Sequence, residues 1–327
     1  MARRRKGRAI DGVVLLDKPP GVSSNHALQR IKYMYGAAKA GHTGSLDPLA
    51  TGMLPICLGE ATKFSRFLLE ADKRYQTTAK LGVRTDSSDA DGEVIETKPV
   101  GDYSVEQIES LLVDHFSGEI EQVPSMFSAL KHNGQPLYKL ARQGIKVEVK
   151  RRRVTIYTIK LLDFRPDAAE LDLEVHCSKG TYIRSIVEDL GLLLGCGAHV
   201  QALRRLDAGP YKAPMMRTLA QIEAIAGVAA DEKVTEAQKQ CDLEGLDALL
   251  LPAWTAVEHL PRIAIDASQT VALGYGQSID LTDSDPSAAE QVLIFTQDEN
   301  EPRFLGLGQI SDDGVLKPRR LIQTAQD

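Results

Sequence analysis

The sequence predicts an α+β fold, in which a mixed, mainly antiparallel sheet is flanked by helices and followed by a small C-terminal β domain. Residues Glu170–Cys177 alternate polar and apolar side chains, which is typical of a strand with one buried face. From Ile183 to Leu190, apolar residues recur at helical spacing. After about Arg262, short apolar runs are separated by glycine and aspartate turns, which indicates a separate β unit. Strands and helices that alternate irregularly favour an α+β core.

Local signals justify the elements in chain order. The apolar run Gly12–Asp17 predicts a buried strand, and Lys18-Pro19-Pro20-Gly21 ends that strand in a turn. Ser23 or Ser24 is expected to cap a helix that runs to about Tyr35. Further elements of the first half are a glycine-marked loop, a helix, a strand and a second helix, over Gly36–Gly52, Glu60–Glu70, Tyr75–Leu81 and Val105–Phe116. Beyond a strand-rich middle section, helical sequence is expected from Ala213 to Pro252, and strands over Ser278–Leu281, Val292–Thr296, Phe304–Ile310 and Val315–Ile322.

The polar turn Thr85–Gly92 carries three aspartates and two serines. It resembles a calcium loop, but it lacks the glutamate that closes the ligand set of such a loop. A solvated hairpin is therefore the expectation for this turn.

Composition excludes several classes of protein. With 327 residues, of which 43% are hydrophobic and 26% charged, the chain is an ordinary globular protein of about two domains. No apolar run approaches the roughly 20 residues of a membrane helix, and the basic start Met1–Lys6 has no apolar run behind it to form a signal peptide. We therefore expect a cytoplasmic protein with no membrane association.

The cysteine and histidine patterns argue against disulfides and metal. The four cysteines, Cys57, Cys177, Cys196 and Cys241, form no Cys-x-x-Cys pair, so reduced thiols are expected. The seven histidines show no spacing typical of zinc ligands, so no metal is expected.

Charge is clustered rather than evenly spread. The formal net charge of −6 argues mildly against a nucleic-acid partner, but phosphate binding depends on where the cations lie. One basic arm covers Arg3–Arg8, and a second basic run is Lys150–Arg153. Each run can either meet phosphates or lie on a solvated surface.

The segment Gly41–Pro55 is the most informative stretch, because its glycines and prolines restrict the backbone around Asp47. A helix start with Asp47 as N-cap and Pro48 at the first helical position is the alternative interpretation. Arg184 stands at a predicted strand-to-helix junction, where it can bind an anion or form a surface ion pair. The twin Arg204-Arg205 can bind phosphate or lie on a solvated face.

Taken together, several segments resemble the bacterial tRNA pseudouridine-55 synthases of the TruB type. They stand in the order and spacing of that family and cover roughly residues 10 to 215: Gly41–Pro48, Lys73–Tyr75, Cys177–Arg184, Gly195–Val200 and Leu203–Leu206. The resemblance implies the pseudouridine synthase core as the fold. It also implies isomerisation of uridine to pseudouridine in the T-arm stem-loop of tRNA, with no cofactor and no obligate protein partner.

Site residues follow from the resemblance position by position. It implies that Asp47 is the catalytic carboxylate, that Arg184 pairs with it, and that Tyr75 stacks on the extruded base. Tyr182 and Leu203 match residues that line the uracil pocket. In the same way, His42 matches a histidine that contacts the flipped-out region of the RNA loop.

The expected domains are a basic N-terminal arm (1–10), a catalytic domain (11–252, core about 11–215) and a β domain (261–327). The last resembles the RNA-binding PUA domain, although acidic residues outnumber basic ones there. Three rival functions stay open: a non-catalytic tRNA-binding protein, a synthase acting on rRNA or with a guide RNA, and a hydrolytic N-glycosidase. Three roles for the Asp47 carboxylate also stay open, namely attack on C1′, addition to C6 and removal of a ribose proton.

Overall fold

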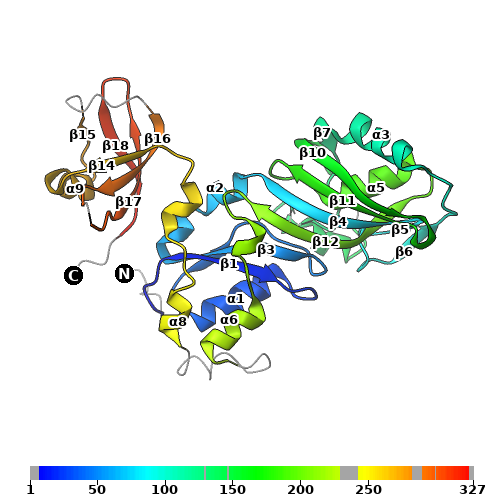
Figure 1. Ribbon diagram of the computed structural model, residues 1–327, viewed down its shortest axis with the longest axis horizontal. Coiled ribbons are helices and arrows are strands. Elements are labelled where there is room, and N and C mark those ends of the chain that lie inside the picture. The colour runs from blue at the N-terminus through cyan, green and yellow to red at the C-terminus, as the bar shows by residue number, and fades with distance from the viewer. Residues whose placement is uncertain are drawn as a thin grey trace.

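A computed structural model describes residues 7–128, 130–145, 147–228, 242–281, 289–298 and 300–323. It contains one large sheet flanked by helices and, towards the C-terminus, a second, smaller sheet (Figure 1). This architecture confirms the predicted α+β fold. The basic residues Arg3 to Lys6, as well as Cys241, lie outside the described residues.

The large sheet has the order β13-β1-β3-β12-β4-β11-β10-β7, with β2 paired to β3. Its strands are β1 (Gly12–Lys18), β2 (Ala40–His42), β3 (Thr51–Leu58), β4 (Lys73–Leu81), β7 (Gly118–Gln122), β10 (Arg152–Arg165), β11 (Glu170–Cys177), β12 (Ala198–Ala208) and β13 (Arg217–Thr218). β12 pairs in parallel with β3 and antiparallel with β4, so it joins the two halves of the sheet. The remaining neighbours are antiparallel, except for β1 and β13.

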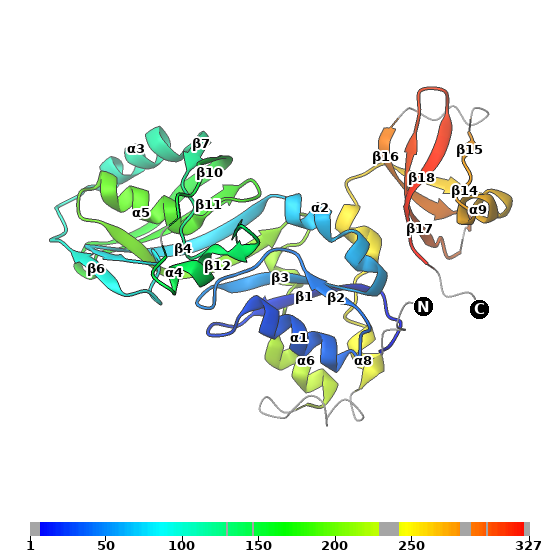
Figure 2. The same cartoon turned by 180° about the vertical axis from the view of Figure 1, so that it is seen from behind.

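Each half of the sheet has its own helices and its own apolar core. α3 (Val105–Phe116) and α5 (Ile183–Leu193) pack on the half formed by β4, β10 and β11. α1 (Ser24–Met34), α6 (Leu219–Ala226) and α8 (Leu243–Asp247) pack on β1 and β3 (Figure 2). Ser23 caps α1 by accepting a hydrogen bond from the His26 backbone N–H, as predicted. The alternation in β11 also matches the prediction, because every second side chain is buried.

The C-terminal sheet has the order β14-β16-β17-β18-β15. Its elements are β14 (Arg262–Ile265), α9 (Ala267–Gly274), β15 (Ile279–Asp280), β16 (Ala289–Thr296), β17 (Phe304–Ile310) and β18 (Val315–Leu321). The predicted strands of this region are present, whereas α9 was not predicted. An apolar cluster joins this sheet to the large one, and within it the rings of Phe64 and Phe304 lie 5.4 Å apart.

Short elements complete the described part of the chain. They are the hairpins β5 (Val83–Thr85) with β6 (Val94–Thr97) and β8 (Lys131–His132) with β9 (Gln135–Pro136), helix α4 (Leu137–Ala141), and the 3-10 turns η1 (Gly59–Lys63), η2 (Pro166–Ala168), η3 (Ala213–Met215) and η4 (Ala253–Val257). None of the helices described here is both long and apolar enough to cross a membrane.

Two local predictions are wrong. The segment 36–52 is not all loop, because it contains β2 and the start of β3. Gly52 has a φ of +97°, and a Cβ there would lie 2.1 Å from the Arg205 carbonyl oxygen, so this glycine permits close strand pairing. The predicted helix 60–70 is split into η1 and α2 (Ser65–Glu70). Thr62 and Ser65 bond through their hydroxyls to the carbonyls of Gly59 and Thr62, which competes with regular helical bonding.

Candidate active site

Asp47 lies in the loop between β2 and β3, and hydrogen bonds from Ser24 and Lys18 hold the backbone of that loop. The Ser24 hydroxyl donates to the Leu46 carbonyl at 3.0 Å and accepts from the Leu46 N–H at 2.8 Å. The fully buried Lys18 ammonium donates to the Pro48 carbonyl at 3.2 Å. No helix begins at Asp47, so the alternative N-cap interpretation is wrong. The surroundings hold the carboxylate on a rigid turn.

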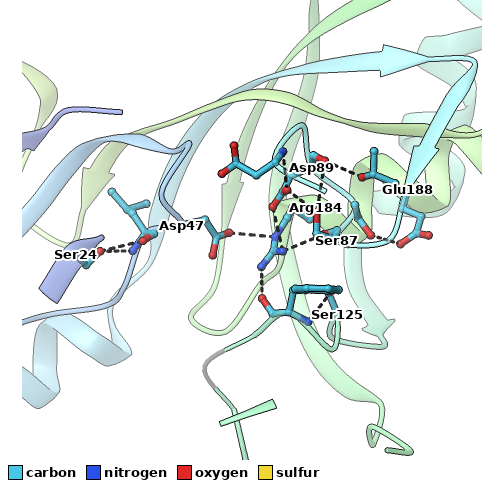
Figure 3. Close-up of polar contacts among 12 residues, drawn as sticks. Ser24, Asp47, Ser87, Asp89, Ser125, Arg184 and Glu188 are labelled. Atoms are coloured by element: carbon cyan, nitrogen blue, oxygen red, sulfur yellow. Dashed lines mark hydrogen bonds and ion pairs between the residues drawn. The ribbon is translucent and has the colours of Figure 1, made fainter. Parts of the chain in front are cut away.

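Arg184, in the first turn of α5, brings three segments together. Its Nε lies 3.1 Å from Asp47 Oδ2, and its Nη1 lies 3.2 Å from Asp89 Oδ2 (Figure 3). The guanidinium also donates to the carbonyls of Ser87 at 2.9 Å and Phe127 at 2.8 Å. The residue is only 4% exposed, so the surface ion-pair alternative is wrong. A planar guanidinium suits this task because its donors diverge in fixed directions.

Asp89 is the residue that the sequence interpretation missed. It lies in the turn between β5 and β6, which was predicted to be solvated, yet Thr85, Ser87, Ser88 and Asp89 are all buried. Glu188 of α5 accepts from the Ser88 hydroxyl at 2.6 Å and from Arg84 at 2.9 Å, which holds the turn against α5. The aspartate and serine content of the turn marked it as polar, but not as the partner of a buried arginine.

Burial and nearby charges shift the pKa values of Asp47 and Lys18. Burial raises the pKa of Asp47, the Arg184 guanidinium lowers it, and the Asp89 carboxylate raises it further, so the net direction is upward. Burial also lowers the pKa of Lys18 to about 8, which the nearby Asp47 carboxylate opposes. The pKa of Asp47 is thus lowered by the buried Lys18 ammonium as well as by Arg184, and it is raised by the buried Asp89 carboxylate.

A cavity of about 310 Å³ opens beside Asp47. Its lining includes five of the six residues named from the sequence: Asp47, Tyr75, Tyr182, Arg184 and Leu203. They come from the β2–β3 loop, from β4 and β12, and from the start of α5, so the cavity lies where the two halves of the sheet meet. Burial raises the pKa of Tyr75, which keeps its hydroxyl protonated near neutral pH.

Tyr182 is held in place through its backbone. Gln122, at the end of β7, accepts from the Tyr182 N–H at 3.0 Å and donates to the Tyr182 carbonyl at 3.2 Å. Gln122 is buried, so both of these bonds are shielded from water. Because Tyr182 precedes α5, the same clamp fixes the helix start that carries Arg184.

His42 does not line this cavity. It ends β2, and its Nδ1 is buried without a hydrogen-bond partner among the residues that the structure describes. Burial lowers the pKa of the imidazole, and the Arg205 charge lowers it further, so the ring is neutral near pH 7. Contact of His42 with RNA stays a prediction.

The solvated-face interpretation is wrong for Arg205, whereas phosphate binding by Arg204 stays a prediction. Arg204 pairs with Asp17 of β1, with nitrogen–oxygen distances of 2.9 and 2.7 Å. Arg205 is almost fully buried, and it donates to the carbonyls of Met53 and Gly44. Both residues therefore hold the seam of the sheet together, and Arg205 also lines the cavity from below.

A larger cleft of about 1040 Å³ includes Arg74, which points to the opposite side of β4 from Tyr75. The Arg74 side chain is paired with Asp207 at 2.8 Å, and Lys212 lies 3.4 Å from the same carboxylate. Asp47 is among the lining residues of the smaller cavity and not among those of this cleft. Among the described residues, no cluster of three or more His, Cys, Asp or Glu side chains is arranged to hold a metal ion.

The cavity has one carboxylate in its lining, that of Asp47, which contacts the Arg184 guanidinium, and the aromatic side chains of Tyr75 and Tyr182 line it as well. This arrangement suits an enzyme that acts on an inserted planar ring. Comparison with known proteins agrees. Three family models cover most of the chain: "TruB family pseudouridylate synthase (N terminal domain)" over residues 32–183, "tRNA pseudouridylate synthase B C-terminal domain" over 184–258, and "Pseudouridine synthase II TruB, C-terminal" over 261–322.

Whole-chain relatives extend this match. The tRNA pseudouridine synthase B of Vibrio cholerae is 52% identical over 98% of this chain and 99% of its own. That of Aeromonas salmonicida is 53% identical over 99% and 98%. The chain therefore belongs to the TruB family of pseudouridylate synthases.

Solved structures share the fold. A Cbf5-Nop10-Gar1 complex includes a chain that is 28% identical, with a TM-score of 0.64, covering 93% of this chain and 79% of that one. A chain in an H/ACA RNP bound to a substrate RNA containing 2′-deoxyuridine matches with a TM-score of 0.68 at 24% identity, over 99% and 92%. The described fold of this protein is thus the pseudouridine synthase fold.

Proposed function

We propose that this enzyme isomerises uridine to pseudouridine in tRNA, at position 55 of the T-loop, with Asp47 as its catalytic carboxylate. The observation that carries the assignment of the site is the 3.1 Å contact between Asp47 and Arg184 at the wall of a cavity that Tyr75 also lines. The family supplies the reaction, and the position within tRNA is the finer part of the proposal.

The reaction breaks the N1–C1′ bond, turns the uracil and joins C5 to C1′. N1 gains a proton, and the hydrogen on C5 leaves as a proton, so atoms and electrons balance without an oxidant or reductant. The target base must leave its stack first, at a cost of a few kcal/mol. Stacking on an aromatic side chain offsets about 1–3 kcal/mol of that cost, and this is the role proposed for the Tyr75 ring.

Asp47 acts as the ionised carboxylate. Cleavage of the glycosidic bond builds positive charge at C1′, which a carboxylate stabilises or traps. Attack on C1′, addition to C6 and removal of a ribose proton all need the same ionised group. In this proposal Arg184 orients that carboxylate and favours its charged form.

A hydrolytic N-glycosidase is the weaker alternative. Such an enzyme needs a second carboxyl group to activate water beside the scissile bond. The sequence interpretation placed one acid at the site, and the structure adds a second, Asp89. Its carboxylate binds Arg184, is buried, and does not line the cavity, so it is badly placed to activate water there.

Exposed cations are candidates for contacts with the RNA backbone. Arg151, just before β10, and Arg153, near its start, are largely exposed, with glutamate partners at 3.4 Å or more. Exposed ion pairs of this kind are weak, so phosphates can replace the glutamates at little cost. A T-arm stem-loop in a cytoplasmic tRNA is the proposed substrate.

The test replaces Asp47 by Asn and measures tritium release from tRNA labelled at C5 of uridine. Formation of pseudouridine should be abolished, while tRNA binding stays close to that of the wild-type enzyme. An active Asp47→Asn enzyme would remove the catalytic assignment. Mass-spectrometric mapping of tRNA from a deletion strain should show uridine, and not pseudouridine, at position 55. If pseudouridine were missing at another position instead, the T-loop assignment would be refuted. Free uracil among the products would revive the glycosidase.

A further inference from the structure

Ser128 presents an unused hydroxyl to the active-site cavity. It lines the same cavity as Asp47 and Tyr75, and it is only 3% exposed. Its Oγ has no hydrogen-bond partner among the described residues. A buried hydroxyl without a partner costs about 1–3 kcal/mol, so one that faces a substrate cavity points to a bond made with the substrate.

The position of this hydroxyl is fixed by the backbone on both sides. The Phe127 carbonyl accepts from Arg184 at 2.8 Å, and the Ser128 carbonyl accepts from the Tyr138 N–H at 3.0 Å. Ser128 is therefore tied both to the guanidinium that contacts Asp47 and to helix α4. These bonds hold the carbonyls on either side of the Ser128 Cα, which suits a donor placed for a fixed acceptor.

Tyr182 supplies a second hydroxyl nearby. Burial raises the pKa of Tyr182, and the Ser128 hydroxyl lowers it, because the two hydroxyls lie close enough for a weak hydrogen-bond contact in the free protein. Even so, Ser128 Oγ makes no hydrogen bond of normal geometry to the described residues. This wall of the cavity is therefore polar, in contrast to the ring of Tyr75 and the side chain of Leu203.

We propose that Ser128 Oγ donates a hydrogen bond to a carbonyl oxygen of the target uracil, which makes Ser128 a further specificity-determining residue. The proposal rests on the function proposed above. Burial favours the base over the ribose, because the ribose must stay joined to the RNA chain at the cavity mouth. Uracil presents acceptors at O2 and O4, on either side of the N3–H donor.

The same bond explains how a detached base is retained. Turning uracil by half a revolution about the N3–C6 axis brings C5 to the place of N1, and it exchanges O2 with O4. One fixed donor therefore meets a carbonyl oxygen both before and after the turn. Ser128 thus donates a hydrogen bond to the base both before and after the turn.

The test combines a change in the enzyme with a change in the substrate. Single-turnover rates are measured for the wild-type enzyme and Ser128→Ala on tRNA that carries uridine, 2-thiouridine or 4-thiouridine at position 55. Ser128→Ala should lower kcat/KM on uridine about 10- to 100-fold, the equivalent of one hydrogen bond to the base. Sulfur is a weak acceptor, so at least one thio substrate should slow the wild-type enzyme and leave Ser128→Ala within about twofold of its uridine rate.

Ser185→Ala is the matched control for the loss of a buried hydroxyl. Ser185 is also buried, but its Oγ already donates to the Val123 carbonyl at 3.1 Å. Ser185→Ala should lower Tm and keep kcat/KM near the wild-type value. Ser128→Ala should keep Tm close to the wild-type value, because the Ser128 hydroxyl makes no hydrogen bond of normal geometry to the described residues.

A tRNA with 2′-deoxyuridine at position 55 is assayed in the same way. Several results would overturn the proposal: wild-type kinetics for Ser128→Ala, thio effects that are the same in both enzymes, or a 2′-deoxyuridine effect that is lost in Ser128→Ala while both thio effects remain. The last would place the hydroxyl at the ribose. If the wild-type enzyme left unmodified uridine at position 55 unconverted, the proposed function would have failed, which is distinguishable from all of these.

Discussion

One guanidinium, that of Arg184, faces two carboxylates of different surroundings. The Asp89 side chain is 5% exposed and binds protein groups through both oxygens: Oδ2 contacts Arg184, and Oδ1 accepts from the Ser87 hydroxyl and the Asp91 N–H. The Asp47 side chain is 36% exposed and also meets the cavity. A buried charge is tolerated only when it is paired and hydrogen-bonded. Asp89 thus neutralises the Arg184 charge on the buried side of the guanidinium, and Arg184 orients the Asp47 carboxylate at the cavity.

The acid limb of the pH–rate profile should therefore depend on Asp89. The reaction needs the ionised Asp47 carboxylate, whose pKa is raised. kcat/KM should therefore be highest above that pKa and fall as pH drops through it. Asp89→Asn removes a negative charge that raises this pKa, so the acid limb should move to lower pH, even where the rate also falls. Single-turnover assays over a pH series measure the limb.

Arg184→Lys is the control for this prediction, because it keeps the positive charge but loses the planar fork. Its rate should fall with little movement of the acid limb. A limb that moved to higher pH in Asp89→Asn would contradict the electrostatic account.

At the scale of elements, α5 positions the turn between β5 and β6. Ser88 in that turn has a φ of +62°, a left-handed conformation that non-glycine residues adopt only when their surroundings hold them. The hydroxyl bond to Glu188 does this, with support from Arg84 on the same carboxylate. Glu188 and Arg184 lie one turn apart on α5, so a single helix face carries both the pairing arginine and the residue that fixes its partner.

Glu188→Ala should loosen the turn and lower kcat more than it raises KM. It removes charge-assisted hydrogen bonds worth about 1.5–3 kcal/mol each, and it leaves Asp89 less firmly held. Amide hydrogen exchange at residues 85–91 should become faster, which mass spectrometry measures.

Glu96→Ala is the matched control, because Glu96 also binds Arg84, at 3.1 Å, but does not bind Ser88. It should leave kcat close to the wild-type value. Equal losses of kcat in the two variants would show that Arg84, and not the Ser88 bond, is what matters.

At the scale of the whole molecule, the C-terminal sheet is joined to the large sheet by a shared apolar cluster. Phe304 lies 5.4 Å from both Phe64 of the catalytic part and Phe295 of its own sheet. Side chain-to-backbone hydrogen bonds also connect the two sheets, because the Lys63 ammonium donates to the Leu321 carbonyl at 2.7 Å, and the Glu60 carboxylate accepts from the Gln323 N–H at 2.8 Å. The two parts should therefore unfold together.

Phe304→Ala should destabilise the whole enzyme by about 3–5 kcal/mol, as deletion of a buried ring does. Calorimetry should show one transition with a lower Tm. Tyr275→Ala is the control, because Tyr275 is 81% exposed and should leave Tm unchanged. Two separate transitions in the wild-type enzyme would show that the C-terminal sheet is an independent unit.

The sequence by itself predicted most of the elements and, through the family resemblance, five residues of the cavity lining. Periodicity predicted β11 and α5 because a buried face imposes a repeat on neighbouring residues, which a single sequence displays. The restricted backbone of the loop around Asp47 and the ordered family segments led to Asp47, Tyr75, Tyr182, Arg184 and Leu203, and the structure brings all five to one cavity.

Only the tertiary structure decided which polar residues are buried and what they bind. Asp89 and Arg184 are 95 positions apart, and Arg205 lies 152 positions from the Met53 carbonyl that it binds. No local pattern records such pairs, so a buried network around Asp89 was interpreted as a solvated turn, and the buried Arg205 as a surface or phosphate-binding group. Burial is a property of packing between distant segments, whereas periodicity is a property of neighbours.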